Sequence, residues 1–438
     1  MPSSSTLTHH FHPWAIQGQA NPLDISKADG VFFWDSQGRR FLDFISQIFN
    51  VNLGHGNQRI IEAIQDQAGK LTTASPSLMH EGRIQLAERL AAVTPSGLDK
   101  AFFTNSGSEA NEIAFSLARM FTGRHKILAK YRSYHGATLG TLGLAGDPRR
   151  APIDVLSPGA VRFFGPYCYR CDFNLKYPSC ELHCADALEQ QILMESPETI
   201  AAIVLEPFTA AAGGYNVPPG YLQRVREICD RNGILMIADE VITGFGRTGE
   251  WFAVNHEGVV PDIMTVAKGL TSGYVPMGAA IVNQTISDHF DEHYLPLGCT
   301  YGNHPLACAA ALATLDEYRE KGAIENCRAQ GHLLSEELAR LKDRHACVGD
   351  VRSQGLFACI ELVRDQSTRE RLIPFNTSNE LEANLKRRCL DEGLHLFVRW
   401  NLLMLSPPLI IKEDELLDGL QHLDAVLTWV DQQLANGH

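Results

Sequence analysis

The sequence lacks several features that would assign a protein to a membrane or nucleic-acid class. No apolar run approaches the roughly 20 residues of a membrane-spanning helix. The first residues, MPSSSTLTHHFHPW, lack the basic and apolar regions of a signal peptide. Basic residues are in the minority, with 38 Lys and Arg against 51 Asp and Glu, and the net charge of −13 argues against a nucleic-acid partner. We therefore expect a cytoplasmic protein that binds neither membranes nor nucleic acids.

Cysteine usage argues against a secreted, disulfide-stapled fold. The 11 cysteines are odd in number and spread through a chain of 438 residues. Four of them, Cys168, Cys171, Cys180 and Cys184, lie close together in the sequence. Four thiolates at this spacing could hold a tetrahedral structural zinc. Free thiols packed in a loop and reversible disulfides are the alternatives, so the pattern alone does not assign a metal.

A repeated order of strand, turn and helix begins near Lys100. Short apolar runs such as Lys126–Ala129 and Ala201–Leu205 alternate with segments of helical spacing. This alternation is typical of an α/β fold with a mostly parallel central sheet covered by helices. After about residue 310 helical segments dominate. We predict a large domain over residues 56–310, and a smaller α+β domain formed by residues 311–438 together with the N-terminal segment 1–55.

Several elements outside the large sheet can also be predicted from periodicity and turn residues. They are a hairpin over Gly30–Phe44, helices over Asn57–Leu71, Glu81–Val93 and about Glu413 to Leu434, and strands over Gly355–Leu362 and Leu394–Ser406.

Two short apolar runs in the middle of the chain each end on a charged residue. Ile234–Ala238 is followed by Asp239, and Asp262–Ala267 is followed by Lys268. Parallel sheets bind ligands at the carboxyl ends of their strands, so these two side chains could share a pocket. Pyridoxal phosphate (PLP) needs such a pair, a lysine that bonds its aldehyde and an acid that keeps its pyridine nitrogen protonated. A buried structural salt bridge is the alternative.

A polar turn, Ser106-Gly107-Ser108, lies where a predicted strand enters a helix. Backbone N–H groups and the helix dipole make such a point an anion site, and glycine lets the backbone approach the anion closely. A plain helix cap is the alternative. Its place before the Asp239–Lys268 pair favours a phosphate site.

Other candidates follow neighbouring runs. The ring of Tyr134, in Tyr134-His135-Gly136, could stack on a pyridine ring, or could be an ordinary core tyrosine. Glu206 ends another predicted strand and could contact a cofactor or cap a helix. Thr300 lies in a turn rich in Gly and Pro and could offer its hydroxyl to a phosphate.

The motifs SGSEAN, YHG, EP, ADEVITGFGRTG, AKG and TYGNHP, in this order and spacing, resemble those of the class III aminotransferases, a family of fold-type I PLP enzymes. The resemblance runs from about Asp29 to Pro408. It implies that Lys268 carries the cofactor and moves the proton, and that Asp239 pairs with the pyridine nitrogen. Val241 and Tyr134 would enclose the ring.

The resemblance also implies an assembly. Gly107 and Ser108 would bind the phosphate together with Thr300 of a second subunit, and Glu206 and His135 would lie behind the residues that touch the cofactor. The family's sites form between two subunits, so we expect a homodimer, with a tetramer as the alternative.

Two positions bear on the substrate. Many family members bind the substrate carboxylate with an arginine in a C-terminal strand, and Arg399 matches it. Trp400-Asn401 stands where the family often has a Gly-Asp turn, so a structural ion pair for Arg399 stays open. In family members that use 2-oxoglutarate, a glutamate covers this arginine. Ala210–Ala212 occupy the place of that glutamate here, so the sequence favours pyruvate as the acceptor of the amino group.

These features lead to three functional hypotheses. The first is an aminotransferase that moves the amino group of a primary (ω-)amine, amino acid or aminosulfonate to an oxo acid. The second is an ammonia- or phospho-lyase of the same family that acts on an aminoethyl phosphate or phosphonate. The third, a catalytically silent scaffold, is disfavoured because both Asp239 and Lys268 are present.

Overall fold

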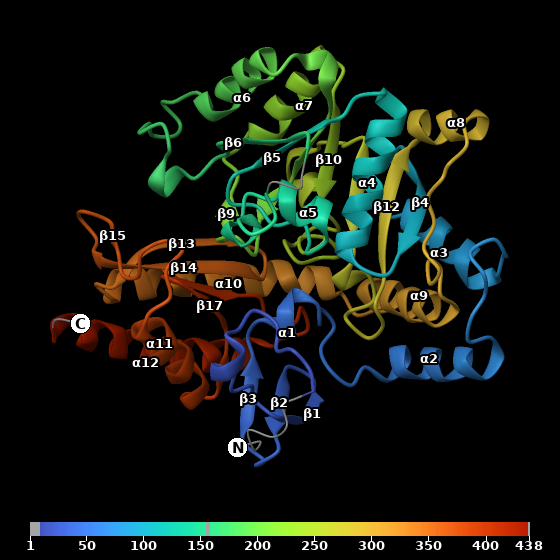
Figure 1. The fold of residues 1–438 in the computed structure, drawn as a ribbon. Coiled ribbons are helices and arrows are strands. Elements are labelled where there is room, and N and C mark those ends of the chain that lie inside the picture. Colours follow the sequence, from blue (N-terminus) through green and yellow to red (C-terminus); the bar gives the residue numbers. More distant parts are fainter. Residues whose placement is uncertain (1–8, 155–157, 437–438) are drawn as a thin grey trace.

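The computed structural model describes residues 9–154 and 158–436. Its centre is a seven-stranded sheet in the order β4-β12-β11-β10-β7-β5-β6 (Figure 1). Only β12 runs antiparallel to its neighbours, so the predicted mostly parallel sheet is confirmed. The strands are β4 (Leu98–Thr104), β5 (Lys126–Lys130), β6 (Ala160–Phe163), β7 (Ile200–Leu205), β10 (Leu235–Asp239), β11 (Ile263–Val266) and β12 (Gly278–Asn283).

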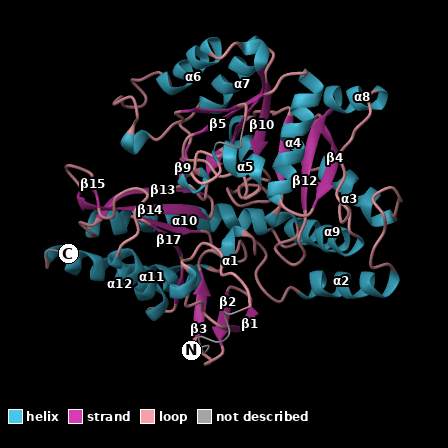
Figure 2. Cartoon of the chain, in the orientation of Figure 1, coloured by secondary structure: helices cyan, strands magenta, loops and turns pink. Residues whose placement is uncertain are grey.

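Helices cover this sheet, as the alternating pattern predicts (Figure 2). The strands β7 and β10 are buried along their whole length, which explains why they read as continuous apolar runs and not as alternating ones. Helix α4 packs against β4, β11 and β12, and α7 packs against β10. The helices are α4 (Gly107–Thr122), α5 (Leu139–Leu144), α6 (His183–Met194), α7 (Tyr221–Asn232) and α8 (Gln284–Glu292).

An N-terminal hairpin and the C-terminal part of the chain lie side by side, next to the large sheet (Figure 1). The predicted hairpin is confirmed as β2 (Phe32–Asp35) and β3 (Arg40–Asp43), and β3 pairs in parallel with β16 (Leu394–His395). A second sheet, formed by the C-terminal part of the chain, has the order β13-β14-β18-β17, where β17 is Phe397–Arg399 and β18 is Leu402–Leu405. The remaining elements are β1 (Ile25–Asp29), β8 (Phe208–Thr209), β9 (Tyr215–Asn216), β13 (Val348–Gln354), β14 (Phe357–Asp365), β15 (Glu370–Arg371), α1 (Ser46–Phe49), α2 (Gln58–Lys70), α3 (Glu81–Ala91), α9 (Pro305–Glu320), α10 (Ala323–Arg344), α11 (Glu380–Asp391) and α12 (Glu413–Ala435).

One predicted strand is divided into several shorter strands in the structure. The single strand expected over Leu394–Ser406 is three short strands, β16, β17 (Phe397–Arg399) and β18 (Leu402–Leu405). Trp400 takes a left-handed backbone conformation, with φ of 54°, which turns the chain so that Arg399 pairs with Leu402. The side chain of Asn401 donates a 3.0 Å hydrogen bond to the carbonyl of Leu362 and fixes this turn.

The predicted domain boundaries at residues 55 and 310 stay predictions. Within residues 9–154 and 158–436, no helix combines the length and the apolar composition that crossing a membrane requires.

Candidate active site

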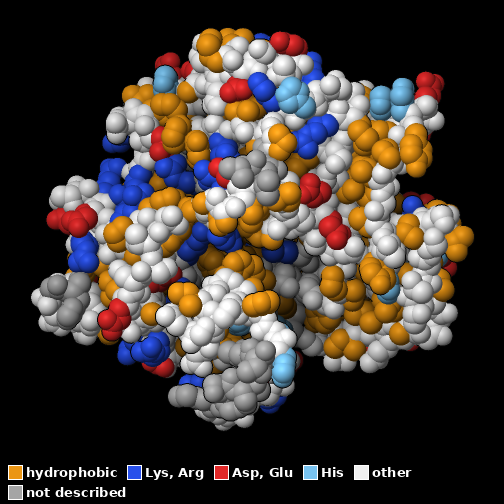
Figure 3. All heavy atoms as spheres, viewed as in Figure 1, with side chains coloured by type: hydrophobic (Ala, Val, Ile, Leu, Met, Phe, Trp, Pro, Cys, Tyr) orange, Lys and Arg blue, Asp and Glu red, His pale blue; other side chains and the backbone are white. Residues whose placement is uncertain are grey.

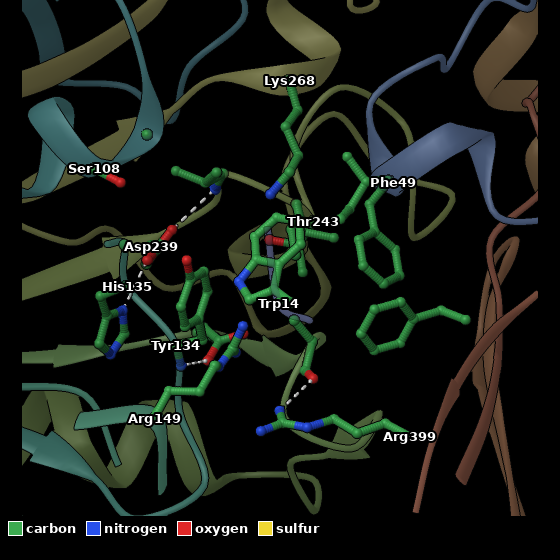
Figure 4. Close-up of a pocket in the computed structure, with 18 of the residues that line it drawn as sticks. Trp14, Phe49, Ser108, Tyr134, His135, Arg149, Asp239, Thr243, Lys268 and Arg399 are labelled. Carbon is green, nitrogen blue, oxygen red and sulfur yellow. Dashed lines mark hydrogen bonds and ion pairs between the residues drawn. The ribbon is translucent and has the colours of Figure 1, made fainter. Parts of the chain in front are cut away.

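A cavity of about 670 Å³ lies at the carboxyl edge of the large sheet, where it faces β17 and the N-terminal part of the chain (Figure 4). Asp239 is the last residue of β10, and Lys268 follows β11 after one residue. Because β10 and β11 are parallel neighbours, with Asp239 opposite Thr265, both side chains enter the same cavity. Of the residues proposed from the sequence, the cavity is lined by Gly107, Ser108, Tyr134, His135, Glu206, Asp239, Val241, Lys268 and Arg399.

The carboxylate of Asp239 is fixed by three neighbours. Its Oδ2 lies 2.7 Å from Nδ1 of His135 and accepts a 2.9 Å hydrogen bond from the amide of Asn111, and its Oδ1 accepts one from the backbone N–H of Val241. Asn111 is held in turn by the hydroxyl of Thr265. The carboxylate is 4% exposed, so this network leaves it one orientation, toward the cavity.

Lys268 occupies an unusual backbone conformation. Its φ of 44° is in the left-handed region, where a side chain with a Cβ is strained, and such strain is concentrated at functional sites. The side chain extends into the cavity (Figure 4). Removal from water lowers the pKa of Lys268 to about 8, while the charges of Asp239 and Glu206 act in the opposite direction. A substantial fraction of this amine is therefore neutral and nucleophilic at mildly alkaline pH.

The N-terminus of α4 forms one wall of the cavity. Gly107 and Ser108 line it, whereas Ser106 does not, because its hydroxyl accepts a hydrogen bond from the N–H of Glu109 as the helix cap. A Cβ on Gly107 would lie 2.7 Å from Cγ1 of Val241, so the close approach of α4 to the turn after β10 requires glycine here. The first N–H groups of a helix have no partner within it, and they favour an anion such as phosphate.

These groups fit PLP. An acid and a lysine face one cavity, a helix N-terminus offers an anion site, and Tyr134 and Val241 line the space between them. His135 supports Asp239 from behind through Nδ1, and its own Nε2 is buried with no hydrogen-bond partner among the described residues. Lys268, Asp239, Gly107 and Ser108 would hold the cofactor.

Glu206 connects two walls of the cavity. One carboxylate oxygen accepts a 3.1 Å hydrogen bond from the N–H of Tyr134, and the other accepts a 2.9 Å bond from the N–H of Ala210. Burial raises the pKa of Glu206. Thr300 is exposed and does not line the cavity of its own chain.

The far end of the cavity holds residues that sequence reasoning missed. The carboxylate of Asp147 pairs with Arg399 and also with Arg149, a second arginine that lines the cavity. Asn111 is the last residue of the SGSEAN motif, but nothing in the sequence places it beside Asp239. Trp14, Phe49 and Thr243 also line the cavity, from distant parts of the chain.

The cysteine cluster gives no support to zinc. Cys168, Cys171, Cys180 and Cys184 line one small cavity of about 20 Å³, and all four are free thiols. No group of three or more His, Cys, Asp or Glu side chains in the described ranges has an arrangement that could hold a metal ion. Burial raises the pKa of Cys184 to about 12, so its thiol keeps its proton.

Comparison with known proteins gives a consistent result. The sequence model of the family described as aminotransferase class-III matches residues 15–427. A putrescine–pyruvate aminotransferase from Pseudomonas aeruginosa is 35% identical over 93% of this chain and 91% of its own length. A taurine–pyruvate aminotransferase from Bilophila wadsworthia is 34% identical over 94% of this chain and 93% of its own. The crystal structure of a taurine:2-oxoglutarate aminotransferase from Bifidobacterium kashiwanohense, in complex with PLP and glutamate, superposes with a TM-score of 0.94 at 38% identity, over 98% of each chain.

Proposed function

The chain belongs to the class III aminotransferases, and from this membership we propose that it moves the amino group of a primary (ω-)amine, amino acid or aminosulfonate to an oxo acid. The observation that carries the proposal is the cavity itself. Lys268 and Asp239 lie at one end, suited to PLP chemistry, and two arginines lie at the other, suited to an acidic substrate group (Figure 4).

The chain's own residues would perform the steps. When bound, PLP supplies an electron-withdrawing ring that accepts the charge left as the substrate carbon loses its proton. The amine of Lys268, with a pKa lowered to about 8, removes that proton and returns it at a different carbon. The carboxylate of Asp239, held by Asn111 and His135, keeps the pyridine nitrogen protonated.

Pyruvate is the acceptor we favour over 2-oxoglutarate. Ala210–Ala212 carry no carboxylate that could cover an arginine, and Ala211 lines the cavity. Two of the relatives described above are named for pyruvate, and the one with the structure is named for 2-oxoglutarate. Initial rates with the two acids and a common donor test this preference.

A lyase that eliminates ammonia or phosphate is the second candidate, because such an enzyme needs no oxo acid. The two reactions differ when the holoenzyme meets the amine alone. Transamination converts the bound cofactor and bleaches its yellow absorbance without further turnover. A lyase keeps the absorbance and releases product continuously. If the absorbance is bleached by the amine and restored by pyruvate, the protein is an aminotransferase. If product is released continuously without an oxo acid, the aminotransferase proposal is wrong and the lyase takes its place.

We propose a homodimer in which Thr300 reaches the partner's phosphate site. Near Thr300, a hydrogen bond of 2.8 Å between His80 and the carbonyl of Asn303 joins two loops that carry exposed apolar side chains. Leu78, Met79 and Tyr301 are each at least 60% exposed there, an apolar area that a second copy would cover. Light scattering gives the mass in solution, and Thr300→Ala should weaken PLP binding. Tight PLP binding by a monomer would contradict this assembly.

The cytoplasmic location expected from the sequence stays a prediction.

A further inference from the structure

Two arginines at the far end of the cavity share one carboxylate. Asp147 Oδ1 lies 2.8 Å from Nε of Arg149 and 3.0 Å from Nη2 of Arg399. Its Oδ2 lies 3.0 Å from Nη2 of Arg149 and 2.7 Å from Nη1 of Arg399. Asp147 is buried, with 1% of its side chain exposed. Two guanidinium groups and one carboxylate leave one net positive charge in this cluster, so it can take up one more anion.

The two arginines differ in the donors that they have left. Both terminal nitrogens of Arg399 donate to Asp147, and its guanidinium lies over the Trp400 ring at 4.2 Å. Arg149 uses Nε and one terminal nitrogen, and its Nη1 has no hydrogen-bond partner among the residues that the structure describes. Arg149 is also more exposed, at 28% of its side chain against 14% for Arg399. Arg149 therefore has a whole terminal nitrogen without a partner among the described residues, whereas Arg399 uses both of its terminal nitrogens.

Arg149 lies at the far end of the cavity, against the ring of Tyr134. Its guanidinium lies 4.1 Å from the centre of the Tyr134 ring, the aromatic ring that lines the cofactor space. Figure 4 shows Arg149 and Arg399 at the end of the cavity opposite Lys268. Lys and Arg side chains also gather along the hollow between the large sheet and the N-terminal part, although the chain is acidic overall (Figure 3).

We propose that Arg149 is a specificity-determining residue that binds the acidic end of the substrate, a carboxylate or a sulfonate, while Asp147 and Arg399 hold it in place. The proposal rests on the aminotransferase function proposed above and narrows its substrate class. Because Arg149 and Lys268 lie at opposite ends, the acidic group lies remote from the carbon that bears the amine. The preferred donors are therefore ω-amino acids and ω-aminosulfonates.

The test compares Arg149→Gln with wild type and with Arg150→Gln. Arg150 is the matched control because it is adjacent, pairs with Asp154 and does not line the cavity; it reaches only the backbone carbonyl of Asp147, over 3.3 Å, and not the carboxylate. Arg149→Gln should raise KM for 2-aminoethanesulfonate and 3-aminopropanoate roughly ten- to a hundredfold, the loss of one charge-assisted contact. KM for 1-phenylethylamine, which carries no acidic group, and the kcat values for all three donors should stay within about threefold of the wild-type values. Arg149→Lys, which keeps the charge without the planar fork, should recover part of the loss.

A binding measurement separates this proposal from the proposed function. Ethanesulfonate and propionate lack an amine, and calorimetric titration of the PLP-loaded protein measures their dissociation constants without turnover. Weaker binding to Arg149→Gln but not to Arg150→Gln supports the site, even if no amine is ever transaminated. Two results for Arg149→Gln would overturn the proposed role of Arg149: an equal rise in KM for donors with and without an acidic group, or unchanged binding of ethanesulfonate and propionate. Neither result would contradict the aminotransferase function. If Arg149→Gln does not fold, Arg149→Lys decides by the same titration.

Discussion

Arg399 donates from both terminal nitrogens to the carboxylate of Asp147, over 2.7 and 3.0 Å, although 252 positions separate the two residues. The sequence left two roles open for Arg399, a ligand for the substrate's acidic group or a member of a structural ion pair. The ion pair is present, and it lies at the wall of the cavity. An incoming acid therefore meets an arginine that already holds a carboxylate, so Arg399 as a direct substrate ligand stays a prediction.

Arg399→Lys tests that prediction. Lysine keeps the positive charge but cannot form the two parallel hydrogen bonds to Asp147. We expect KM for amines with an acidic group to rise about three- to tenfold, because losing the fixed geometry of the cluster should cost about 1 kcal/mol of substrate-binding free energy. KM for 1-phenylethylamine should hardly change. Steady-state kinetics with both donor types gives the comparison, and equal losses for both would assign Arg399 a purely structural role.

Lys268 should be the residue that bonds PLP. Borohydride reduction of the holoenzyme followed by peptide mapping should place the pyridoxyl group on Lys268. Lys268→Ala should lose all turnover yet still bind PLP through the α4 N-terminus and Asp239. A label on any other lysine would contradict the whole assignment of the site.

The pH dependence of PLP capture follows from the environment of Lys268. Only the neutral amine attacks the aldehyde, and burial lowers the pKa of Lys268 to about 8. For apo protein mixed with PLP, the rate should rise through pH 8 and level off above about pH 9, with about one-tenth of the maximum at pH 7. An exposed lysine would need a pH above 10.

The control for this measurement is Asp239→Asn. The charge of Asp239 raises the pKa of Lys268, so its removal should move the midpoint of capture to lower pH. The ionisation of PLP itself is common to both proteins and cancels in the comparison. A midpoint that stays fixed would mean that the two side chains do not interact.

Asp239→Asn should also slow proton removal from the substrate. The carboxylate lies on a network with Asn111, His135 and Val241 that an amide fits in shape, but the amide carries no charge to stabilise the protonated ring nitrogen. A loss of roughly 100- to 1,000-fold in single-turnover rate is expected. Glu240→Gln is the matched control, an adjacent buried acid outside the cavity whose pKa burial raises to about 7. A near-normal rate for Asp239→Asn would remove Asp239 from the mechanism.

The central part of this site could be predicted because it depends on strand ends. Asp239 and Lys268 each follow an apolar run, and parallel neighbours put such residues at one edge of a sheet. The same reasoning fails where a contact joins different layers. Nothing in the spacing indicates that Asp147, after α5, meets Arg399, the last residue of β17, because that contact depends on how distant parts of the chain pack.

The other misses have local causes. The single strand predicted over Leu394–Ser406 is wrong because most of its residues are apolar, while the reversal depends on the left-handed backbone of Trp400, a residue that rarely takes it. Ser106 and Ser108 are equivalent in a turn motif, and only the direction of the helix decides that Ser106 caps it while Ser108 lines the cavity.

The last prediction concerns Asp147 as the carboxylate that keeps two arginines together. Both guanidinium groups hold its pKa far below the usual range, so it is ionised at every pH at which the protein is studied. Asp147→Ala should lower the free energy of unfolding by about 3 kcal/mol, at the lower end for a broken buried ion pair because Arg149 is partly exposed. The sign of the pH dependence is fixed: the contribution is present above the ordinary aspartate pKa of about 4 and is lost as the pH falls below it. The difference between wild type and variant should therefore shrink in acid.

Added acetate should replace the missing carboxylate. An anion that binds only the folded variant stabilises it by mass action, so the unfolding midpoint of Asp147→Ala should rise with acetate concentration. Chloride at equal ionic strength corrects for screening, and wild type, whose site already holds a carboxylate, should respond less. Asp147→Ala combined with Arg149→Gln should lose most of the response, since one of the two cations is gone. If acetate stabilises neither wild type nor Asp147→Ala beyond the effect of chloride, the cluster does not act as an anion site, and the ion pair of Arg399 is a structural contact alone.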